Sequence, residues 1–225
     1  MTHCWNCKSE VADPDFCTTC GKIQPLLESI DFFRFLGFKE LLALDVNELE
    51  HRFYDLSKKF HPDFYQNRTE KEQQISLEKA SFLNKAYKTL KDPFSRAKYL
   101  LELMLENEKS SDKKNIPPDL LMEVMELHEL IDSLNDEENE QKRDDMQKEI
   151  LRIRDELRRK SGSLGVELIN IFSKWDNVAE HWNGTKLLCG EHRNLLKEMN
   201  DILVIRQYIE TLLHSIEQEI PEESI

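Results

Sequence analysis

The sequence predicts an all-α protein that begins with a short cysteine-bearing module. Charged residues make up 33% of the chain and hydrophobic residues 39%, with only 6 glycines and 7 prolines, a composition that favours solvated helices over sheet. Apolar residues recur every three or four positions along several segments. Two capping boxes mark helix starts. We expect the cysteine module, a helical hairpin and a C-terminal three-helix bundle, in that order.

Four cysteines lie within the first 20 residues, in two pairs with Cys-x2-Cys spacing. They are Cys4 with Cys7, and Cys17 with Cys20. Two such turns can close four thiolates around one tetrahedral Zn(II). Metal binding would also supply the folding free energy that a short, polar segment lacks. We therefore predict one structural Zn(II) per chain, held by a module that spans residues 1–26.

Other interpretations of these cysteines remain open. Disulfides are disfavoured in a reducing compartment, and a thioredoxin-like redox pair would need a βαβ setting that the sequence lacks. Iron in a rubredoxin-like site would use the same four ligands as zinc. A zinc-dependent enzyme would need an open metal position, whereas four cysteines indicate a closed site. We expect no enzymatic activity.

The first helix of the hairpin is expected to start at a capping box formed by Asp45 and Glu48. Asp45 can accept from first-turn amides while Glu48 reaches back to the N–H of the cap. The helix should stop before Pro62. Its apolar stripe, on a period of 3.6 residues, consists of Val46, Leu49, Phe53, Leu56 and Phe60.

A second capping box, from Thr69 to Glu72, is expected to start the second helix of the hairpin. Its apolar stripe consists of Leu77, Ala80, Leu83, Tyr87 and Leu90. Because only a short loop joins the two helices, we expect them to be antiparallel, with each stripe burying the other. Asp92-Pro93 then starts a further helix, with proline at its first position.

A domain boundary is expected at residues 106–116, which are polar and lack apolar periodicity. This linker would separate a domain at 27–105 from a helical bundle at 117–225. The helices of the bundle are expected to run from Pro118 to about Leu134, from Glu137 to Arg159 and from Asn194 to Glu219. The stretch from Ser161 to Gly190 contains four glycines and predicts no clear boundaries.

Charge and hydropathy exclude several classes of partner. A net charge of -13 argues against a general nucleic-acid binder, because neutralising phosphates needs a concentrated Lys/Arg surface. No apolar run approaches the roughly 20 residues that span a bilayer, so we expect no membrane partner. Neither a secretion signal nor an Arg-rich transit peptide is recognisable at the start. We expect a cytoplasmic protein, with the mitochondrial matrix as the alternative for a processed form.

The hairpin loop contains the tripeptide His61-Pro62-Asp63. In isolation His61 and Asp63 would be ordinary helix-end and turn residues, since Asp commonly accepts from loop amides. Neither has a paired nucleophile or base nearby in the sequence, so a hydrolytic role is weakly supported. The capped hairpin around the loop favours a docking role.

In this setting the tripeptide resembles the J-domain family. The resemblance extends to Asp31-Phe32-Phe33 with Leu36-Gly37, to residues 84–90 and to Asp92-Pro93. Within that family the chain is similar to the HscB-type co-chaperones of iron–sulfur cluster assembly, some of which carry similar cysteine knuckles. The resemblance implies that the loop docks on a DnaK/HscA-type chaperone and stimulates its ATPase.

Three basic residues on the helix before the loop are further candidates for chaperone binding: Arg52, Lys58 and Lys59. They could equally form an ordinary solvated face. Because the chain as a whole is acidic, a basic cluster beside the tripeptide favours the functional interpretation.

The helix that starts at Pro118 carries two apolar faces. One face, which packs into the bundle, consists of Leu120, Val124, Leu127, Ile131 and Leu134. The other carries Leu121, Met122 and Met125 beside Glu126 and Glu129. An apolar patch rimmed by carboxylates is typical of a partner site, and Met suits adaptable contacts. A helix at the centre of its bundle would instead bury both faces.

The resemblance implies that the second face holds an IscU-type scaffold protein, with Ile202 of the last helix as a further member. The chain would then deliver the scaffold to the chaperone. The alternative is a J protein that serves a different client and uses its C-terminal helices for dimerisation or general folding. Binding to a cluster scaffold would separate the two.

Overall fold

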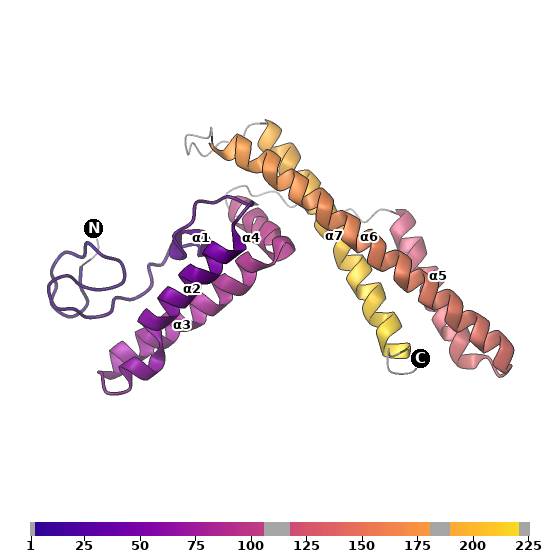
Figure 1. The fold of residues 1–225 in the computed structure, drawn as a ribbon, viewed down its shortest axis with the longest axis horizontal. Coiled ribbons are helices and arrows are strands. Elements are labelled where there is room, and N and C mark those ends of the chain that lie inside the picture. The colour runs from indigo at the N-terminus through magenta and orange to yellow at the C-terminus, as the bar shows by residue number, and fades with distance from the viewer. Residues whose placement is uncertain (1–2, 106–117, 181–189, 221–225) are drawn as a thin grey trace. The chain divides into compact units, whose positions relative to one another are not determined.

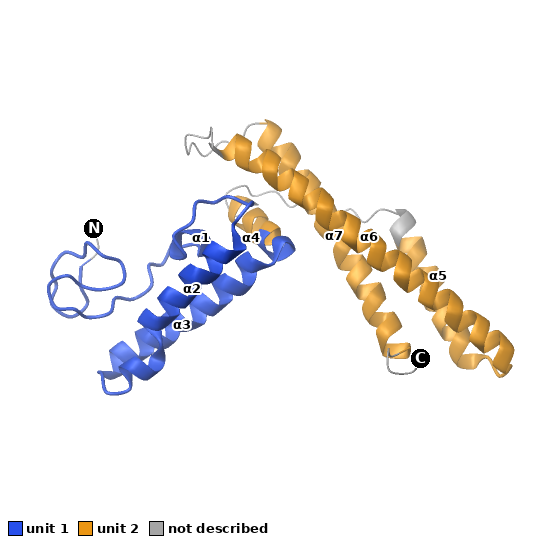
Figure 2. Ribbon diagram, viewed as in Figure 1, with its two compact units in different colours: residues 1–96 blue, residues 97–225 orange. Residues whose placement is uncertain are grey.

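The computed structural model describes residues 3–105, 118–180 and 190–220, and these residues are mostly helical. Within them the β-structure is limited to two isolated bridges, so the all-α prediction is confirmed. The chain divides into two compact units, residues 1–96 and 97–225 (Figure 2). In the described ranges no helix is long and apolar enough to cross a membrane. The predicted linker, 106–116, lies outside these ranges.

The first unit contains the cysteine module and an antiparallel helical hairpin (Figure 1). Its elements are α1 (Phe32–Phe35), α2 (Val46–Phe60), the 3₁₀ turn η1 (Pro62–Tyr65), α3 (Glu70–Lys91) and the start of α4 (Pro93–Leu105). The rings of Phe53 on α2 and Tyr87 on α3 stack at 4.2 Å between centroids. This pair joins the two arms of the hairpin.

Both predicted helix starts are found, with one difference in detail. Thr69 and Glu72 form the full reciprocal capping box of α3. At α2, Asp45 accepts from the backbone N–H groups of Asn47 and Glu48. The Glu48 carboxylate pairs with Arg52 at 2.7 Å instead of returning to the cap. An arginine one turn along the helix therefore competes with the cap for Glu48.

The predicted apolar stripe of α3 is correct in its second half and wrong at Leu77. Leu83 and Leu90 are buried, but the Leu77 side chain is 57% exposed. The buried side chains of the first half of α3 include Ile75 and Lys79 instead. Two residues along an α-helix turn by about 200°, so burying Lys79 directs Leu77 to solvent. A helix face assigned from its apolar residues alone does not include a buried lysine, so the position of Lys79 was not predicted.

The second unit contains three long helices, α5 (Pro118–Asp136), α6 (Glu140–Glu180) and α7 (Gly190–Glu219). Helices α6 and α7 pack along each other, and α5 packs against both (Figure 1). Its core contains Leu168, Trp175, Met199, Ile209 and Ile216, each at most 1% exposed. This is the predicted three-helix bundle.

Helix α6 is about twice as long as the sequence predicted, because it continues past Arg159 to Glu180. The sequence predicted no clear boundaries between Ser161 and Gly190, and the structure shows that the helix runs through Gly162. Apolar side chains keep recurring on one face beyond this point, and Leu164, Leu168 and Trp175 are all buried. Their burial outweighs the cost of a glycine in a helix, which is about 1 kcal/mol.

Candidate functional site

The four cysteines of the N-terminal module converge on one point. All four Sγ atoms lie within 4.8 Å of one another. The Sγ atoms of Cys4 and Cys20 are 3.7 Å apart, and those of Cys7 and Cys17 are 3.6 Å apart. Four sulfurs about 2.3 Å from a central ion would be separated by about 3.8 Å in a regular tetrahedron. The cysteines are therefore positioned to bind one metal ion.

Each cysteine pair is held in a tight turn by its own backbone. The N–H of Lys8 donates to the carbonyl of Cys4 at 3.0 Å, and that of Gly21 to the carbonyl of Cys17 at 2.8 Å. Lys8 and Gly21 both follow a second cysteine and both have left-handed backbone angles. Glycine adopts this conformation freely, whereas lysine adopts it at some cost. The same turn therefore recurs at both cysteine pairs. Its backbone is strained only at Lys8, after the first pair.

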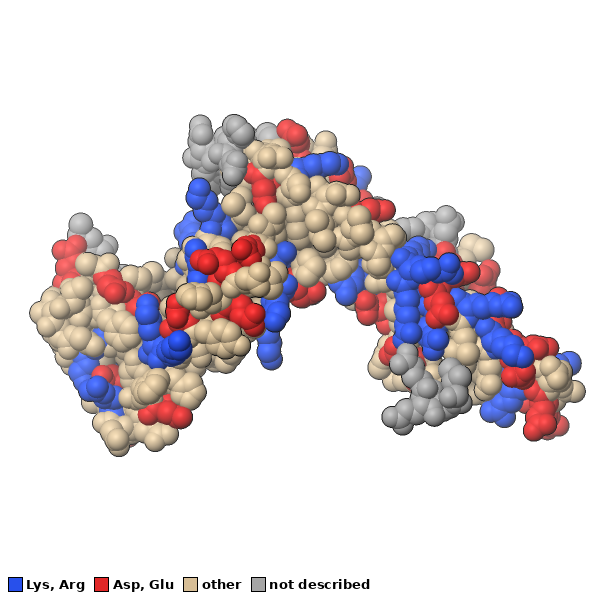
Figure 3. All heavy atoms as spheres, in the orientation of Figure 1, with Lys and Arg blue, Asp and Glu red and all other residues tan. Residues whose placement is uncertain are grey.

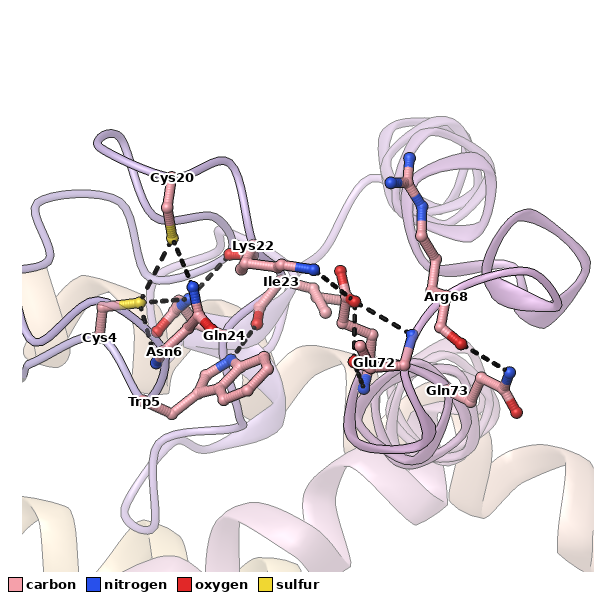
Figure 4. Close-up of polar contacts among 11 residues, drawn as sticks. Cys4, Trp5, Asn6, Cys20, Lys22, Ile23, Gln24, Arg68, Glu72 and Gln73 are labelled. Carbon is pink, nitrogen blue, oxygen red and sulfur yellow. Dashed lines mark hydrogen bonds and ion pairs between the residues drawn. The ribbon is translucent and has the colours of Figure 1, made fainter.

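Hydrogen bonds lower the pKa of the Cys4 and Cys17 thiols and so favour their metal-binding thiolate form, whereas burial and the neighbouring thiols raise the pKa of Cys20. The Asn6 side-chain amide donates to the Cys20 sulfur at 3.7 Å, and that of Gln24 to the Cys4 sulfur at 3.5 Å (Figure 4). The Ser9 hydroxyl is the main group that lowers the pKa of the Cys17 thiol, to about 5. Cys17 is thus ready to coordinate a cation near neutral pH.

The loop tripeptide lies at the end of α2 and presents its side chains to solvent. His61 caps the helix, and Pro62 starts η1. The side chains of His61 and Asp63 are 50% and 68% exposed. The Nδ1 atom of His61 accepts from the backbone N–H of Asp63 at 3.3 Å, which orders the turn. An exposed and ordered polar loop is suited to docking.

A hollow of about 520 Å³ lies between α2 and α3, directly beside the tripeptide. His61 and Pro62 form part of its wall, and Leu77 and Ala80 of α3 line it as well. The exposed Leu77 thus adds apolar surface next to the loop. The helical periodicity of α3 places Leu77 in the core, so the sequence does not predict this exposed position.

The three basic candidates fall into two groups. Lys58 and Lys59 are exposed in the last turn of α2, beside the tripeptide. Arg52 instead stacks over the Phe38 ring at 4.1 Å and donates to the carbonyl groups of Leu36 and Gly37. Arg52 therefore ties α2 to the segment after α1, while the two lysines are available to a partner.

The second face of α5 is exposed, as the sequence predicted. Leu121, Met122 and Met125 are 48%, 59% and 57% exposed, and both Glu126 and Glu129 reach solvent. On the other face Leu127, Ile131 and Leu134 are buried, whereas the side chain of Leu120 lies outside the described residues. The alternative in which α5 buries both faces is therefore wrong.

Ile202 does not join this surface. It is 7% exposed and belongs to the buried face of α7. We therefore leave it out of the α5 surface, which we define as Leu121, Met122, Met125, Glu126 and Glu129.

Two family models match the chain, and they follow the two helical parts in order. The DnaJ domain matches residues 31–99, which include the hairpin and its tripeptide. The chain is therefore a J-domain protein. The HSCB C-terminal oligomerisation domain matches residues 116–181. Together with the relatives below, this second match makes the chain similar to the HscB-type J-domain proteins.

The relatives carry the same family name. The iron-sulfur cluster co-chaperone protein HscB homolog of Arabidopsis thaliana is 36% identical over 133 residues, 59% of this chain and 52% of the relative. The Mus musculus protein of that name is 33% identical over 132 residues, 56% of each chain. The chain thus spans just over half the length of the curated relatives that it matches.

Solved structures give the same fold. The crystal structure of human co-chaperone protein HscB covers 98% of this chain and 100% of its own, with a TM-score of 0.65 and 25% identity. The chaperone HscB from Vibrio cholerae covers 84% of this chain and 96% of its own, with a TM-score of 0.53 and 23% identity. The latter is similar in fold alone.

Proposed function

We propose that this protein is a co-chaperone that docks its His61-Pro62-Asp63 loop on a DnaK/HscA-type chaperone and stimulates its ATPase. In doing so it would deliver an IscU-type scaffold for iron–sulfur cluster assembly or transfer. The observation that carries the proposal is the exposed, ordered tripeptide at the tip of a capped hairpin, in a chain of the HscB type. The relatives are named as iron–sulfur cluster co-chaperones.

The proposed mechanism is a population shift in the chaperone. A partner drives such a change only by binding one state better than the other. The Asp63 carboxylate is exposed, so a cationic group of the chaperone that meets it in one state alone would supply this difference. Lys58 and Lys59, in the last turn of α2, would steer the approach of an acidic surface.

Asp63→Asn tests the mechanism in a single-turnover ATPase assay with a DnaK/HscA-type chaperone. We expect stimulation to fall by about tenfold or more, since the variant removes the charge but keeps the shape of the side chain. Asp55→Asn is a matched control, because it removes an exposed carboxylate from α2 itself. Stimulation that is lost equally in both variants, or kept in both, would contradict the role of Asp63.

We infer that the cysteine module holds one structural Zn(II) per chain. The support is the tetrahedral spacing of four thiols and the closed ligand set, which leaves no position for a substrate. Elemental analysis of the purified chain should give about one zinc per chain. If elemental analysis instead gives about one iron per chain, the site is of the rubredoxin-like type.

A second candidate function for the C-terminal helices is self-association. The matching model describes this region as an oligomerisation domain. Val166 and Ile169 of α6 are exposed apolar residues. Figure 3 shows an area with few charged side chains over the middle of α6. If this area joins two copies, Val166→Ser with Ile169→Ser should lower the mass measured by sedimentation equilibrium from dimer to monomer.

A further inference from the structure

Lys79 of α3 is a cation inside the protein. It is 1% exposed, the most deeply buried charged side chain that the structure describes. A buried ammonium group is destabilising unless an anion and other polar groups surround it. Its Nζ atom lies 2.6 Å from Oδ1 of Asp15 and 3.5 Å from the carbonyl oxygen of Pro14. Both partners belong to the cysteine module, from the segment between its two Cys-x2-Cys pairs.

The same lysine touches the residue that precedes the tripeptide. The Lys79 ammonium group lies 4.5 Å from the centre of the Phe60 ring, and Phe60 is the last residue of α2. Phe16 of the cysteine module also stacks on the Phe60 ring, with the two ring centroids 6.3 Å apart. The Ser76 hydroxyl donates to the Phe60 carbonyl at 2.8 Å. The module thus packs directly against the residue next to His61.

Further contacts spread this interface along α3. The Lys22 ammonium group pairs with the Glu72 carboxylate at 2.7 Å, as Figure 4 shows. Lys71 places its ammonium group 4.9 Å from the centre of the Trp5 ring. Trp5 donates to the carbonyl of Ile23 at 2.8 Å, which fixes the ring within the module. These contacts, together with the buried Lys79, show that the cysteine module packs against α3.

We propose that the metal-bound cysteine module positions the His61-Pro62-Asp63 loop through Asp15, Phe16, Lys79 and Phe60. Asp15 and Lys79 are positioning residues, because they act on the loop through Phe60. The conformational coupling stands on these contacts alone, and its effect on a chaperone rests on the function proposed above. Docking by the hairpin then depends on whether the four thiols hold a metal.

The physical reason is that the metal orders the segment that neutralises Lys79. The module is short and polar, so removal of the metal removes most of the free energy that keeps it folded. Asp15 and Phe16 would then leave the surface of the hairpin. Lys79 and Phe60 would then lose the carboxylate and the ring that cover them, and Lys79 would turn away from Phe60 to hydrate its ammonium group. The end of α2 and the loop after it lose their fixed position as a result.

Amide hydrogen exchange of residues 60–66 in the full chain tests the coupling without a chaperone. Removing the metal with a chelator should raise exchange in this segment by about tenfold or more. Asp15→Asn should raise it while the metal content stays at its wild-type value. Glu10→Gln is the matched control, since Glu10 is an exposed carboxylate of the same module, and it should leave exchange unchanged.

Lys79→Met makes the test sharper, because methionine fills similar space without a charge that needs an anion. Asp15 keeps partial access to solvent, at 23% exposure, and tolerates the loss of its partner. In this variant we expect metal removal to raise exchange at residues 60–66 several-fold less than in the wild type. Equal increases in both proteins, or no increase in the wild type, would overturn the coupling.

ATPase stimulation, measured in parallel, separates this inference from the proposed function. Stimulation that falls on metal removal in the wild type, and falls less in Lys79→Met, would support both. Metal-dependent exchange in a chain that stimulates no chaperone would support the coupling and refute the proposed function. If the chain still stimulates the chaperone but exchange at residues 60–66 does not change when the metal is removed, the coupling is refuted and the proposed function is not.

Discussion

Asp63 and Lys79 carry opposite charges in opposite surroundings, and this difference sets what each can do. Asp63 is exposed, so its charge is hydrated in the free protein and can discriminate between states of a partner. Lys79 is buried, so its charge must be balanced inside the chain, and Asp15 balances it. Substitution of Asp63 should therefore change binding, whereas substitution of Asp15 should change the structure around the loop.

Glu72 is the residue for which pH dependence can be predicted. Burial raises the pKa of its carboxyl group, but hydrogen bonds from Lys22 and Thr69 outweigh burial and hold the pKa below its ordinary value of 4.5. A folded-state pKa below the unfolded one means that the charged group adds stability above the unfolded value. This contribution is lost as the pH falls through the folded-state pKa.

Glu72→Gln should therefore lower the thermal midpoint at pH 7, and the gap to the wild type should close as the pH falls below about 4.5. Thermal unfolding at a series of pH values measures the gap, with the metal content measured at each pH, because metal release would remove Lys22 from Glu72. Glu70→Gln, an exposed neighbour in the first turn of α3, is the control. A gap of constant size from pH 7 to pH 3 would show that the carboxylate charge contributes nothing.

At the level of elements, α6 shows how packing overrides local preference. The sequence predicted a helix only to Arg159, yet the buried series of Leu164, Leu168 and Trp175 keeps the chain helical to Glu180. On α3 the opposite occurs at Leu77, where an apolar residue is exposed because Lys79 takes the buried position. In both elements the decisive factor is the surface against which the helix packs.

Gly162→Ala tests whether α6 is continuous. A Cβ atom at Gly162 would meet no atom within 4 Å, so the variant should stabilise α6 by up to about 1 kcal/mol. Amide exchange along α6 measures the change. Gly21→Ala is the contrasting variant, because its left-handed backbone should make alanine destabilising in the cysteine module, by about 1 kcal/mol. A loss of protection in α6 of Gly162→Ala would favour the interrupted helix.

For the whole molecule, the two proposed docking surfaces belong to different compact units. The tripeptide lies in residues 1–96, and the α5 surface lies in residues 97–225. Because the surfaces share no residues, the two activities should be separable by substitution. The proposal that a client is delivered to a chaperone requires both surfaces in one chain.

Met122→Ser combined with Met125→Ser should weaken binding of an IscU-type scaffold by about tenfold or more, since exposed apolar anchors carry much of the affinity of such surfaces. Calorimetry measures the affinity, and ATPase stimulation without scaffold should stay at the wild-type level. The pair His128→Ser and Asp132→Ser is the control, because it removes two exposed side chains of α5 that lie outside the α5 surface. Equal loss of scaffold affinity in both pairs would argue against a specific α5 site.

The sequence alone determined the features that are encoded locally. Helix starts at Asp45 and Thr69 follow from side chains that bond to backbone groups within the same turn. The convergence of the four cysteines follows from the spacing of two Cys-x2-Cys turns. The exposed face of α5 follows from a helical period that carries more apolar residues than one seam needs.

Only the tertiary structure decided how distant segments share a buried surface. The pairing of Lys79 with Asp15 joins residues 64 positions apart, and no local pattern indicates it. The exposure of Leu77 and the burial of Ile202 follow from the same cause, since burial depends on which neighbouring segment covers a helix face. A charge or an apolar group is stable inside a protein only with particular neighbours, and folding brings those neighbours together.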